Sequence, residues 1–404
     1  MRGKSITDLT QEYLPYIIEN KENIENLQIL DAKEIPGCRD GDNFMSVVIR
    51  TQLKGIFKNG NPFEKSVITK IYPSGSDKFV TLVRMRDLFC NEAHSYENIL
   101  PAIGAQSLAP ECFFANSEKI ILEDLSLDNF SICDRQHLLN YDHCRHVLQA
   151  LAQIHAGSLK LKLNNPEYFR NLIKPITEVV FAEKSNIQTK LSLERSLNHA
   201  IQSLETIQPP TANSEKCLKF LKKYPNKVYE IVKASTIAHG SYDVLIHGDV
   251  WKNNIFFSKN NPNDNNMRVK FVDFQAMRHA SLALDLHYFL YTSVELNVFD
   301  NHYNDIMQIY HRELLNELKS SITMEHYEAL NYNWFAREIE KHAAYGLFFA
   351  LSLVHVILAD DGTIKISVSE NGQELNTKVP FSTQKTKRIE RIVTHFINTF
   401  GDID

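Results

Sequence analysis

DVLIHGDVWKNNIFFSKNNPNDNNMRVKFVDFQ, residues 243–275, says more about this chain than any other segment of it. An apolar run at 244–246 leads into the triplet HGD, which ends at Asp249, and Asn254 follows five positions later. A second apolar run ends in the triplet DFQ, which begins at Asp273. Phosphoryl transfer from ATP needs one carboxylate for the acceptor hydroxyl, and an amide and a second carboxylate to hold magnesium. The stretch therefore predicts an enzyme that phosphorylates an alcohol.

The second half of this stretch has the pattern of a β-hairpin. Residues 254–258 and 268–273 are rich in apolar and aromatic residues, and the intervening KNNPNDNNM is dominated by turn formers. A hairpin returns the chain to its start, so Asn254 and Asp273 should share one ion. Magnesium prefers such oxygen ligands. We therefore predict these two residues as Mg²⁺ ligands and Asp249 as the catalytic base.

Composition is typical of a globular enzyme. The length of 404 residues suggests two or three structural units, and the 43% hydrophobic content is enough for a substantial core. A net charge of -5 favours neither nucleic acid nor an anionic membrane as partner. The sequence contains neither a membrane-length apolar run nor the apolar core of a signal peptide, which predicts a cytoplasmic location. The six cysteines lack paired spacing and are expected to be reduced thiols.

The N-terminal part has the features of an ATP-binding region. Residues 27–35, 44–53 and 64–71 are β-rich runs. The tight turn between the first two contains Asn43. It lacks a glycine-rich phosphate signature, so by itself it also fits a plain hairpin turn. In the context of the other motifs, we place Asn43 and Ser46 near the nucleotide.

Lys70 lies inside the third β-rich run, and Glu92 follows 22 positions later in a segment with the periodicity of an amphipathic helix. In kinases a strand lysine holds the nucleotide phosphates and pairs with a helix glutamate. We predict Lys70 and Glu92 as this pair. Lys65 and Glu97 are the neighbours most easily mistaken for it.

The rest of the chain is mostly helical in pattern. Apolar residues recur near a period of 3.6 in five segments, namely 135–159, 217–237, 281–296, 300–318 and 327–358. Short strands and a nucleotide turn come first, and helices dominate after residue 130. This order is the one expected of the α+β fold with two unequal lobes that the resemblance described below implies.

These motifs together resemble the protein-kinase-like superfamily, in the branch of small-molecule kinases that includes aminoglycoside and choline kinases. HGDVWKNNIFF followed by VDFQ resembles the insect ecdysteroid-kinase-like family more closely, with Trp251 two positions after the aspartate and Gln275 in place of the glycine of DFG. Further matches occur in consistent order within residues 30–295: GDNFMSVVIR (41–50), SVITKIYP (66–73), FCNEAHSYENILP (89–101), ILEDL (121–125) and LAQIHAGS (151–158).

The resemblance implies a two-lobed protein-kinase-like fold that uses ATP and Mg²⁺. A small antiparallel β-rich N-lobe would comprise residues 1–122, a hinge 123–127, and a larger helical C-lobe 128–404. The C-lobe would carry the catalytic and metal loops and the acceptor-binding helices. Backbone groups of Glu123 and Leu125 would bind the adenine edge.

Asp285 and Lys252 are two further residues with an expected role near the site. Asp285 matches an aspartate that the family carries in the helix after the metal loop, and we expect it to brace the catalytic loop. Lys252 occupies a position from which it either reaches a phosphate or faces solvent. Because catalysis here would be mainly positioning and charge neutralisation, a raised pKa of Asp249 is not required.

The acceptor is predicted as a small-molecule alcohol. The segment between Asp273 and Asp285 lacks an A-P-E motif and a threonine- or tyrosine-bearing activation loop, which a protein substrate would normally need. The resemblance implies an ecdysteroid or a similar hydroxylated apolar compound. One alternative is a choline- or aminoglycoside-type kinase, which would need an anionic acceptor pocket. Another is a catalytically silent kinase-like protein that binds a steroid or a nucleotide.

Overall fold

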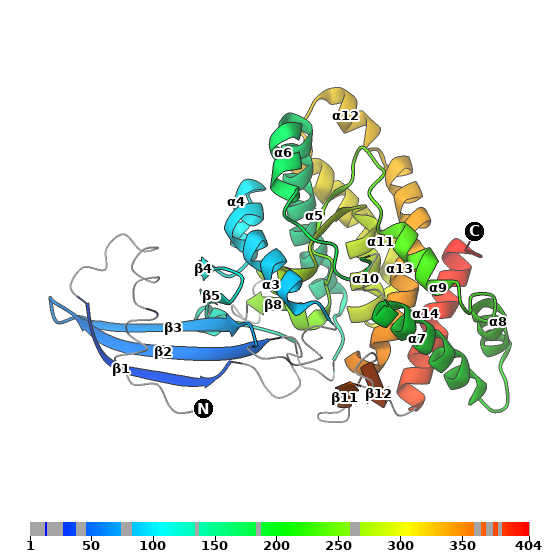
Figure 1. Ribbon diagram of the computed structural model, residues 1–404. Helices are drawn as coiled ribbons and strands as arrows, with labels where there is room; N and C mark the ends of the chain where they lie inside the picture. The colour runs from blue at the N-terminus through cyan, green and yellow to red at the C-terminus, as the bar shows by residue number, and fades with distance from the viewer. Residues whose placement is uncertain are drawn as a thin grey trace.

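A computed structural model shows two unequal lobes, a β-rich N-terminal one and a larger helical C-terminal one (Figure 1). This arrangement confirms the predicted α+β fold class. The residues that the structure describes are 13, 27–37, 46–73, 83–133, 137–182, 187–258, 267–358, 365–368, 375–378 and 382–403.

An antiparallel five-stranded sheet forms the N-terminal lobe, with strand order β1-β2-β3-β5-β4. The strands are β1 (Leu27–Pro36), β2 (Val47–Phe57), β3 (Pro62–Ile71), β4 (Cys112–Ala115) and β5 (Lys119–Glu123). The three predicted β-rich runs are therefore confirmed as strands. One face of the sheet buries a small apolar cluster that includes Leu53, Val67 and Ile121. Alternation along the strands puts these side chains on the same face.

The helix that follows the third strand lies against the large core of the molecule. α3 (Met85–His94) continues into a π-helical turn (Ser95–Ile99) and a short helix α4 (Leu100–Ala102). Phe89 and Tyr96 from this segment belong to the main hydrophobic core. π-helical turns often mark functional sites, and this one directly follows the helix that carries Glu92.

Helices make up most of the C-terminal lobe. They are α5 (Tyr141–Asn164), α6 (Pro166–Ile173), α7 (Ile187–Glu205), α8 (Ala212–Leu221), α9 (Val228–Ser235), α10 (Ala283–Ser293), α11 (Leu296–Leu318), α12 (Met324–Ala329), α13 (Tyr332–Ile357) and α14 (Thr383–Phe400). Within the described ranges, no helix is long and apolar enough to span a bilayer.

Two segments predicted as single helical stretches are interrupted. Segment 217–237 breaks between α8 and α9, where Pro225 disfavours helical backbone before it and Asn226 has a φ of 64°. Segment 327–358 breaks before α13, where Asn331 caps the new helix by accepting a hydrogen bond from the Trp334 amide. The apolar periodicity of the sequence continues through both breaks. Only the capping and turn residues at these positions indicate that a helix ends there.

Short strands position the loops of the C-terminal lobe. β6 (Phe130–Ser131), β8 (Ile255–Ser258) and β9 (Val269–Phe271) form one sheet, and β7 (Val244–Ile246) pairs with β10 (Arg278–Ala280). β8 and β9 are antiparallel, which confirms the predicted hairpin. A further hairpin comprises β11 (Lys365–Val368) and β12 (Leu375–Lys378).

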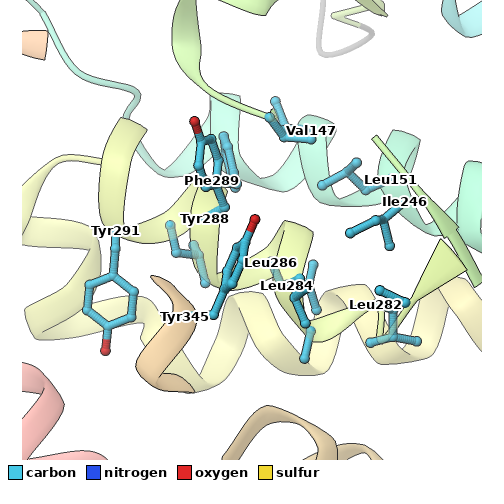
Figure 2. Close-up of a cluster of buried hydrophobic side chains, with 14 of the residues drawn as sticks. Val147, Leu151, Ile246, Leu282, Leu284, Leu286, Tyr288, Phe289, Tyr291 and Tyr345 are labelled. Atoms are coloured by element: carbon cyan, nitrogen blue, oxygen red, sulfur yellow. The ribbon is translucent and has the colours of Figure 1, made fainter. Parts of the chain in front are cut away.

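The core of the C-terminal lobe is built around α10, every residue of which is buried. Figure 2 shows side chains of α10, among them Leu284 and Leu286, clustered with Ile246 of β7 and Leu151 of α5. Tyr345 of α13 joins the same cluster. A helix buried on all sides is a rigid support, and the loop after β7 lies directly on it.

Gly346 lets α13 approach α10 closely. A Cβ atom at this position would lie 2.5 Å from the Cβ of His287 and 2.8 Å from its backbone carbonyl carbon. We expect Gly346→Ala to destabilise the protein by about 1–3 kcal/mol, because overpacking a tight helix crossing outweighs the gain in helix propensity. Thermal unfolding measures the change. Lys341→Ala, an exposed position of the same helix, is the control and should leave the midpoint nearly unchanged.

His287 should make stability sensitive to acid. Its side chain is buried and Nε2 lies 2.7 Å from the carbonyl oxygen of Ile339. Burial lowers the pKa of His287 to about 4, below the ~6.5 of an unfolded histidine. The unfolded chain therefore binds the proton preferentially. Stability should be intact above about pH 6.5 and fall by about 2–3 kcal/mol as the pH drops towards 4.

Guanidinium unfolding measured across this pH range tests that expectation. His287→Gln should flatten the pH dependence, whatever its effect on stability at neutral pH. An unchanged slope in the variant would show that other groups cause the acid sensitivity.

Candidate active site

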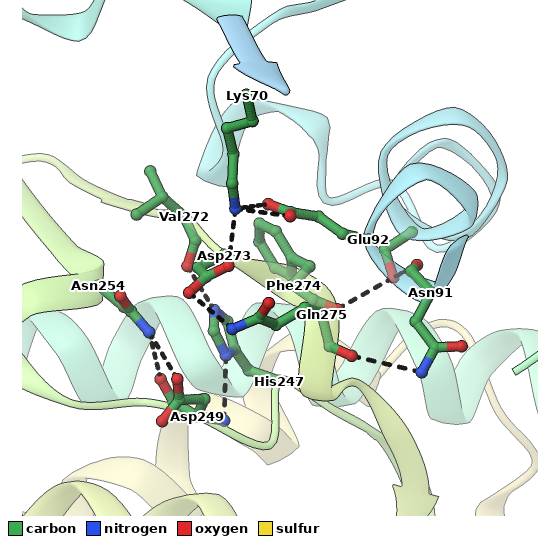
Figure 3. A network of polar contacts seen from close by, with 11 residues as sticks. Lys70, Asn91, Glu92, His247, Asp249, Asn254, Val272, Asp273, Phe274 and Gln275 are labelled. Carbon is green, nitrogen blue, oxygen red and sulfur yellow. Dashed lines mark hydrogen bonds and ion pairs between the residues drawn. The ribbon is translucent and has the colours of Figure 1, made fainter. Parts of the chain in front are cut away.

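The loop after β7 passes very close to the turn at 274–276. Gly248 has a φ of 81°, and a Cβ atom there would lie 2.1 Å from the carbonyl oxygen of Ala276. Only glycine tolerates this combination of conformation and contact. The following residue, Asp249, is thereby placed beside the β8–β9 hairpin (Figure 3).

Asp285, on α10, holds this loop in place. Its two carboxylate oxygens accept hydrogen bonds from the amides of His247 and Gly248, at 2.8 and 2.9 Å. Nε2 of His155 lies 3.2 Å from Oδ2, the same oxygen that accepts from the amide of His247. Burial alone would raise the pKa of Asp285, but the hydrogen bonds from His155 and the loop outweigh it and the pKa lies below its ordinary value. The predicted bracing role of Asp285 is confirmed by these contacts.

Both carboxylate oxygens of Asp249 have a partner. Oδ1 accepts a hydrogen bond from the hydroxyl of Tyr288 at 2.6 Å, and Oδ2 accepts one from Asn254 Nδ2 at 3.0 Å. Burial, helped by the nearby charge of Asp273, raises the pKa of Asp249 to about 7, although both hydrogen bonds oppose the shift. Catalysis by positioning alone would not require this raised pKa of Asp249. It makes Asp249 a better proton acceptor than an ordinary carboxylate.

Asp273 and Asn254 lie at the same end of the hairpin. Asp273 has the left-handed conformation, with φ 70° and ψ 57°, directly after β9. Its Oδ2 accepts a hydrogen bond from Gln275 Nε2 at 3.0 Å. The amide nitrogen of Asn254 donates to Asp249, which leaves its amide oxygen for a cation. Backbone strain of this kind is concentrated at functional sites.

Lys70 links three elements of the site. Its Nζ lies 2.7 and 2.6 Å from the two carboxylate oxygens of Glu92 on α3, and 2.8 Å from Oδ1 of Asp273. Burial would lower the pKa of Lys70, but the two carboxylates outweigh it and raise the pKa above its ordinary value. The lysine is therefore charged. Figure 3 shows it pointing from the N-terminal sheet between these carboxylates.

Lys65 and Glu97, the residues most easily mistaken for the Lys70–Glu92 pair, have other partners. Lys65 Nζ lies 4.6 Å from the centre of the Phe113 ring, and Glu97 Oε1 accepts a hydrogen bond from the amide of Ala115. The structure thus brings together Lys70 and Glu92, and not Lys65 and Glu97. Strand β3 lies between β2 and β5, so Lys70 is on an interior strand rather than an edge.

α3 is attached to the turn after Asp273. Asn91 Nδ2 donates to the carbonyl oxygen of Gln275 at 3.3 Å, and the hydroxyl of Ser95 donates to that of Phe274 at 3.4 Å. The ring of Phe274 packs edge-on against Tyr96. The helix that carries Glu92 and the loop that carries Asp273 therefore hold each other in position.

The connection between the lobes follows β5. The amide of Glu123 donates to the carbonyl oxygen of Glu111, so only its carbonyl is left for an adenine edge. Its carboxylate forms an ion pair with Lys270 of β9 at 2.9 Å. Asp124 caps the turn at 125–128 by accepting a hydrogen bond from Ser126 N. The Leu125 side chain is buried, which is consistent with a role for its backbone only.

Three further residues with a predicted role are Asn43, Ser46 and Lys252. Asn43 lies outside the described residues. Ser46 immediately precedes β2, two positions before Val48, which pairs with Lys70. Lys252 is 3% exposed and donates a hydrogen bond to the carbonyl oxygen of His137, so the prediction of a solvent-facing side chain is wrong.

Three residues of the site were missed from sequence. Tyr288 binds the carboxylate of Asp249, Lys270 binds the connection between the lobes, and Arg50 pairs with Asp124 at 2.7 Å. Only Tyr288 had a usable signal, because it lies three positions after Asp285 and hence on the same face of a helix.

No group of three or more His, Cys, Asp or Glu side chains in the described part of the chain is arranged to hold a metal. A cavity of about 860 Å³ lies between α4, β4 and the end of β5, and its walls do not include Asp249 or Asp273. A smaller one, of about 260 Å³, is bordered by α9 and β10.

Two of three comparisons with known proteins found a match. The model of the ecdysteroid kinase-like family matches residues 40–321, more than half of the chain. Among solved structures, the chain is similar to an ethanolamine kinase from Plasmodium vivax. The two are 12% identical with a TM-score of 0.40, and the alignment covers 99% of this chain and 96% of that chain. A comparison with curated proteins found no match.

Proposed function

Because this chain belongs to the ecdysteroid kinase-like family, we propose that it transfers the γ-phosphoryl group of ATP to a hydroxyl of an ecdysteroid or a similar hydroxylated apolar compound. The observation that carries the proposal is the contact set at the end of the hairpin. Lys70 is paired with Glu92 and Asp273, while Asp249 stands beside Asn254. Phosphoryl transfer from ATP uses these groups in these places.

The nucleotide would lie between the lobes. Lys70 is charged and would orient the phosphates, with Asn43 and Ser46 close to them. The carbonyl of Glu123 and the amide of Leu125 would meet the adenine edge. In this proposal residues 1–122 form the nucleotide lobe, 123–127 the hinge and 128–404 the acceptor lobe.

A magnesium ion fits the donors of this site. Asp273 is a carboxylate held in a strained conformation, and the free amide oxygen of Asn254 lies at the same end of the hairpin. Hard oxygen donors of this type suit Mg²⁺, which neutralises phosphate charge when bound. Asp273 and Asn254 would hold it.

Asp249 would orient the acceptor hydroxyl and take its proton. Its pKa of about 7 allows it to be ionised in the resting enzyme and to hold a proton after transfer. Tyr288 and Asn254 fix the direction of the carboxylate, so little reorganisation is needed. Dependence on ATP fits the predicted cytoplasmic location.

An amino alcohol is the second candidate acceptor, and the aromatic rings at the site are compatible with it. The rings of Tyr288, Tyr345 and Phe349 pack together next to Asp249, with centroid distances of 5.5 Å for Tyr288–Phe349 and 4.7 Å for Tyr345–Phe349. Aromatic faces hold quaternary ammonium groups such as choline. The same rings suit an apolar steroid, so the acceptor panel must contain both classes.

The test is incubation with Mg²⁺-ATP and a panel of hydroxysteroids, choline, ethanolamine and aminoglycosides, followed by mass spectrometry for a phosphate adduct. The proposal expects an adduct on a hydroxysteroid. An adduct only on an amino alcohol would replace it with the second candidate. A thermal shift with steroid, but none with Mg²⁺-ATP, would identify a silent binding protein.

A further inference from the structure

Residues 172–178 hold helix α3 against the C-terminal lobe, and we call them the anchor segment. Arg84, just before the helix, donates from Nη1 to the carbonyl oxygen of Glu178 at 2.9 Å. At the last residue of the helix, Nε2 of His94 lies 2.8 Å from the carbonyl oxygen of Leu172. Helix α3 is therefore fixed at both of its ends to the larger lobe.

Asn91, between these two ends, joins three segments at one point. Its Nδ2 donates to the carbonyl oxygen of Thr177 at 2.8 Å, and its Oδ1 accepts from the amide of Thr177 at 2.9 Å. Nδ2 also donates to the carbonyl oxygen of Gln275 at 3.3 Å (Figure 3). A reversed amide would set its oxygen against two carbonyl oxygens, so these contacts fix the orientation of the side chain. The amide is 3% exposed, and it connects α3, the anchor segment and the turn after β9.

The anchor segment also holds the chain beyond this turn. A carboxylate oxygen of Glu178 lies 3.6 Å from Nε of Arg278 in β10, two residues after the turn at 274–276. The guanidinium is buried, and Glu178 Oε1 is itself fixed by the amide of Phe181 at 2.9 Å. The turn is therefore supported from the anchor segment on two sides, through Asn91 and through Arg278.

Gln275 passes this support on to Asp273. Its Nε2 donates to Oδ2 of Asp273 at 3.0 Å, and the other carboxylate oxygen accepts from Lys70 at 2.8 Å. Asp273 has a φ of 70°, and a non-glycine residue keeps such a conformation only where its surroundings fix it. Two hydrogen bonds in sequence thus lead from Asn91 through Gln275 to this carboxylate.

We propose that Asn91 is a positioning residue, which transmits the support of the anchor segment through Gln275 to Asp273 and so keeps that carboxylate in place for Mg²⁺. The inference rests on the proposed function, in which Asp273 holds the ion. It adds a buried residue that acts on the metal only through other residues.

Asn91→Leu keeps the approximate size of the side chain and removes its hydrogen bonds. The readout is the metal advantage, defined as the ratio of ATP affinity with Mg²⁺ to that with EDTA. This ratio should fall by about 3- to 10-fold, with the affinity in EDTA and the KM for the acceptor little changed. A merely structural role would lower the unfolding temperature and leave the ratio intact, and that result would overturn the proposal.

Gln275→Met tests the same path from its other end. This side chain is only partly buried, so the variant should fold even if Asn91→Leu does not. It should lower the metal advantage to a similar extent. The double variant should lose no more than the more affected single variant, because both changes interrupt one path. Fold losses that multiply, or an unchanged ratio in Gln275→Met, would show that the support does not pass through Gln275 and would refute the inference.

His94→Leu is the matched control on α3. His94 contacts Leu172 and Asn98, whereas Asn91 contacts the turn. The variant should therefore keep the metal advantage, even if its unfolding temperature falls. A loss equal to that of Asn91→Leu would mean that any weakening of the anchor segment has this effect, and Asn91 would have no special role.

Hydrogen exchange without nucleotide separates this inference from the proposed function. The amides of Val272 and Met277 are hydrogen-bonded to the carbonyl oxygens of Asn254 and Phe274. Exchange in a peptide that covers 272–277 should be about 3- to 10-fold faster in Asn91→Leu, and unchanged in His94→Leu. This result in a protein that shows neither a metal advantage nor phosphorylation would sink the proposed function alone. Unchanged exchange in Asn91→Leu would sink the positioning role, whatever the reaction.

Discussion

Replacing Asp249 with asparagine should lower kcat by about 10²- to 10⁴-fold while the affinity for Mg²⁺-ATP changes little. Asparagine preserves the shape of the side chain, and its carbonyl oxygen can still accept one hydrogen bond from Tyr288 or Asn254. It cannot take the proton of the acceptor hydroxyl. The loss should therefore appear in turnover. Initial rates of ADP formation, measured with an acceptor that the wild-type protein phosphorylates, report kcat. Thermal shifts caused by Mg²⁺-ATP report the affinity for the nucleotide.

Asp142→Asn is the matched control, since Asp142 is an exposed carboxylate in the first turn of α5, outside the site. It should retain the full rate. A full rate in Asp249→Asn as well would mean that another group accepts the proton, and the proposed mechanism would be wrong.

Replacing Asp273 with asparagine should remove the dependence of ATP binding on magnesium. Asparagine tolerates the left-handed backbone of this position better than alanine would, so the turn after β9 should survive. The negative charge that faces Lys70 and would hold the metal is lost. Affinity for ATP in the presence of Mg²⁺ should fall by about 100-fold, to the level that the wild-type protein shows with EDTA.

Calorimetric titration of ATP with Mg²⁺ and with EDTA measures this difference. Lys65→Met serves as a charge-changing control on β3, because Lys65 packs on Phe113 rather than in the site. If Asp273→Asn still bound ATP more tightly with Mg²⁺ than with EDTA, Asp273 would not be the principal metal ligand.

The main features of the fold and the pairing of Lys70 with Glu92 were predictable because they depend on local patterns. Alternating polarity identified β2 and β3, and the turn formers after Ser258 identified the hairpin. A strand lysine and a helix glutamate at a suitable separation then had few alternatives. Periodicity and turn chemistry report directly on short-range structure.

Features that depend on packing between distant segments were not predictable in this way. Tyr288 reaches Asp249 only because α10 lies directly under the loop that follows β7. The solvent-facing alternative for Lys252 was wrong because its ammonium donates to the carbonyl of His137, more than a hundred residues earlier. The raised pKa of Asp249 arises from burial and from Asp273, and both require the complete fold. Single-sequence patterns carry no such long-range information.

Strand β9 limits how the two lobes can move against each other. Lys270, within the strand, pairs with Glu123, and Asp273, just beyond its end, pairs with Lys70. Both partners belong to the N-terminal sheet. A rigid strand fixed at two points can turn only about the line that joins them, because any other rotation stretches one ion pair. Under the proposed function, a nucleotide should therefore enter and leave by a twist of the lobes around β9 rather than by a wide separation of the lobes.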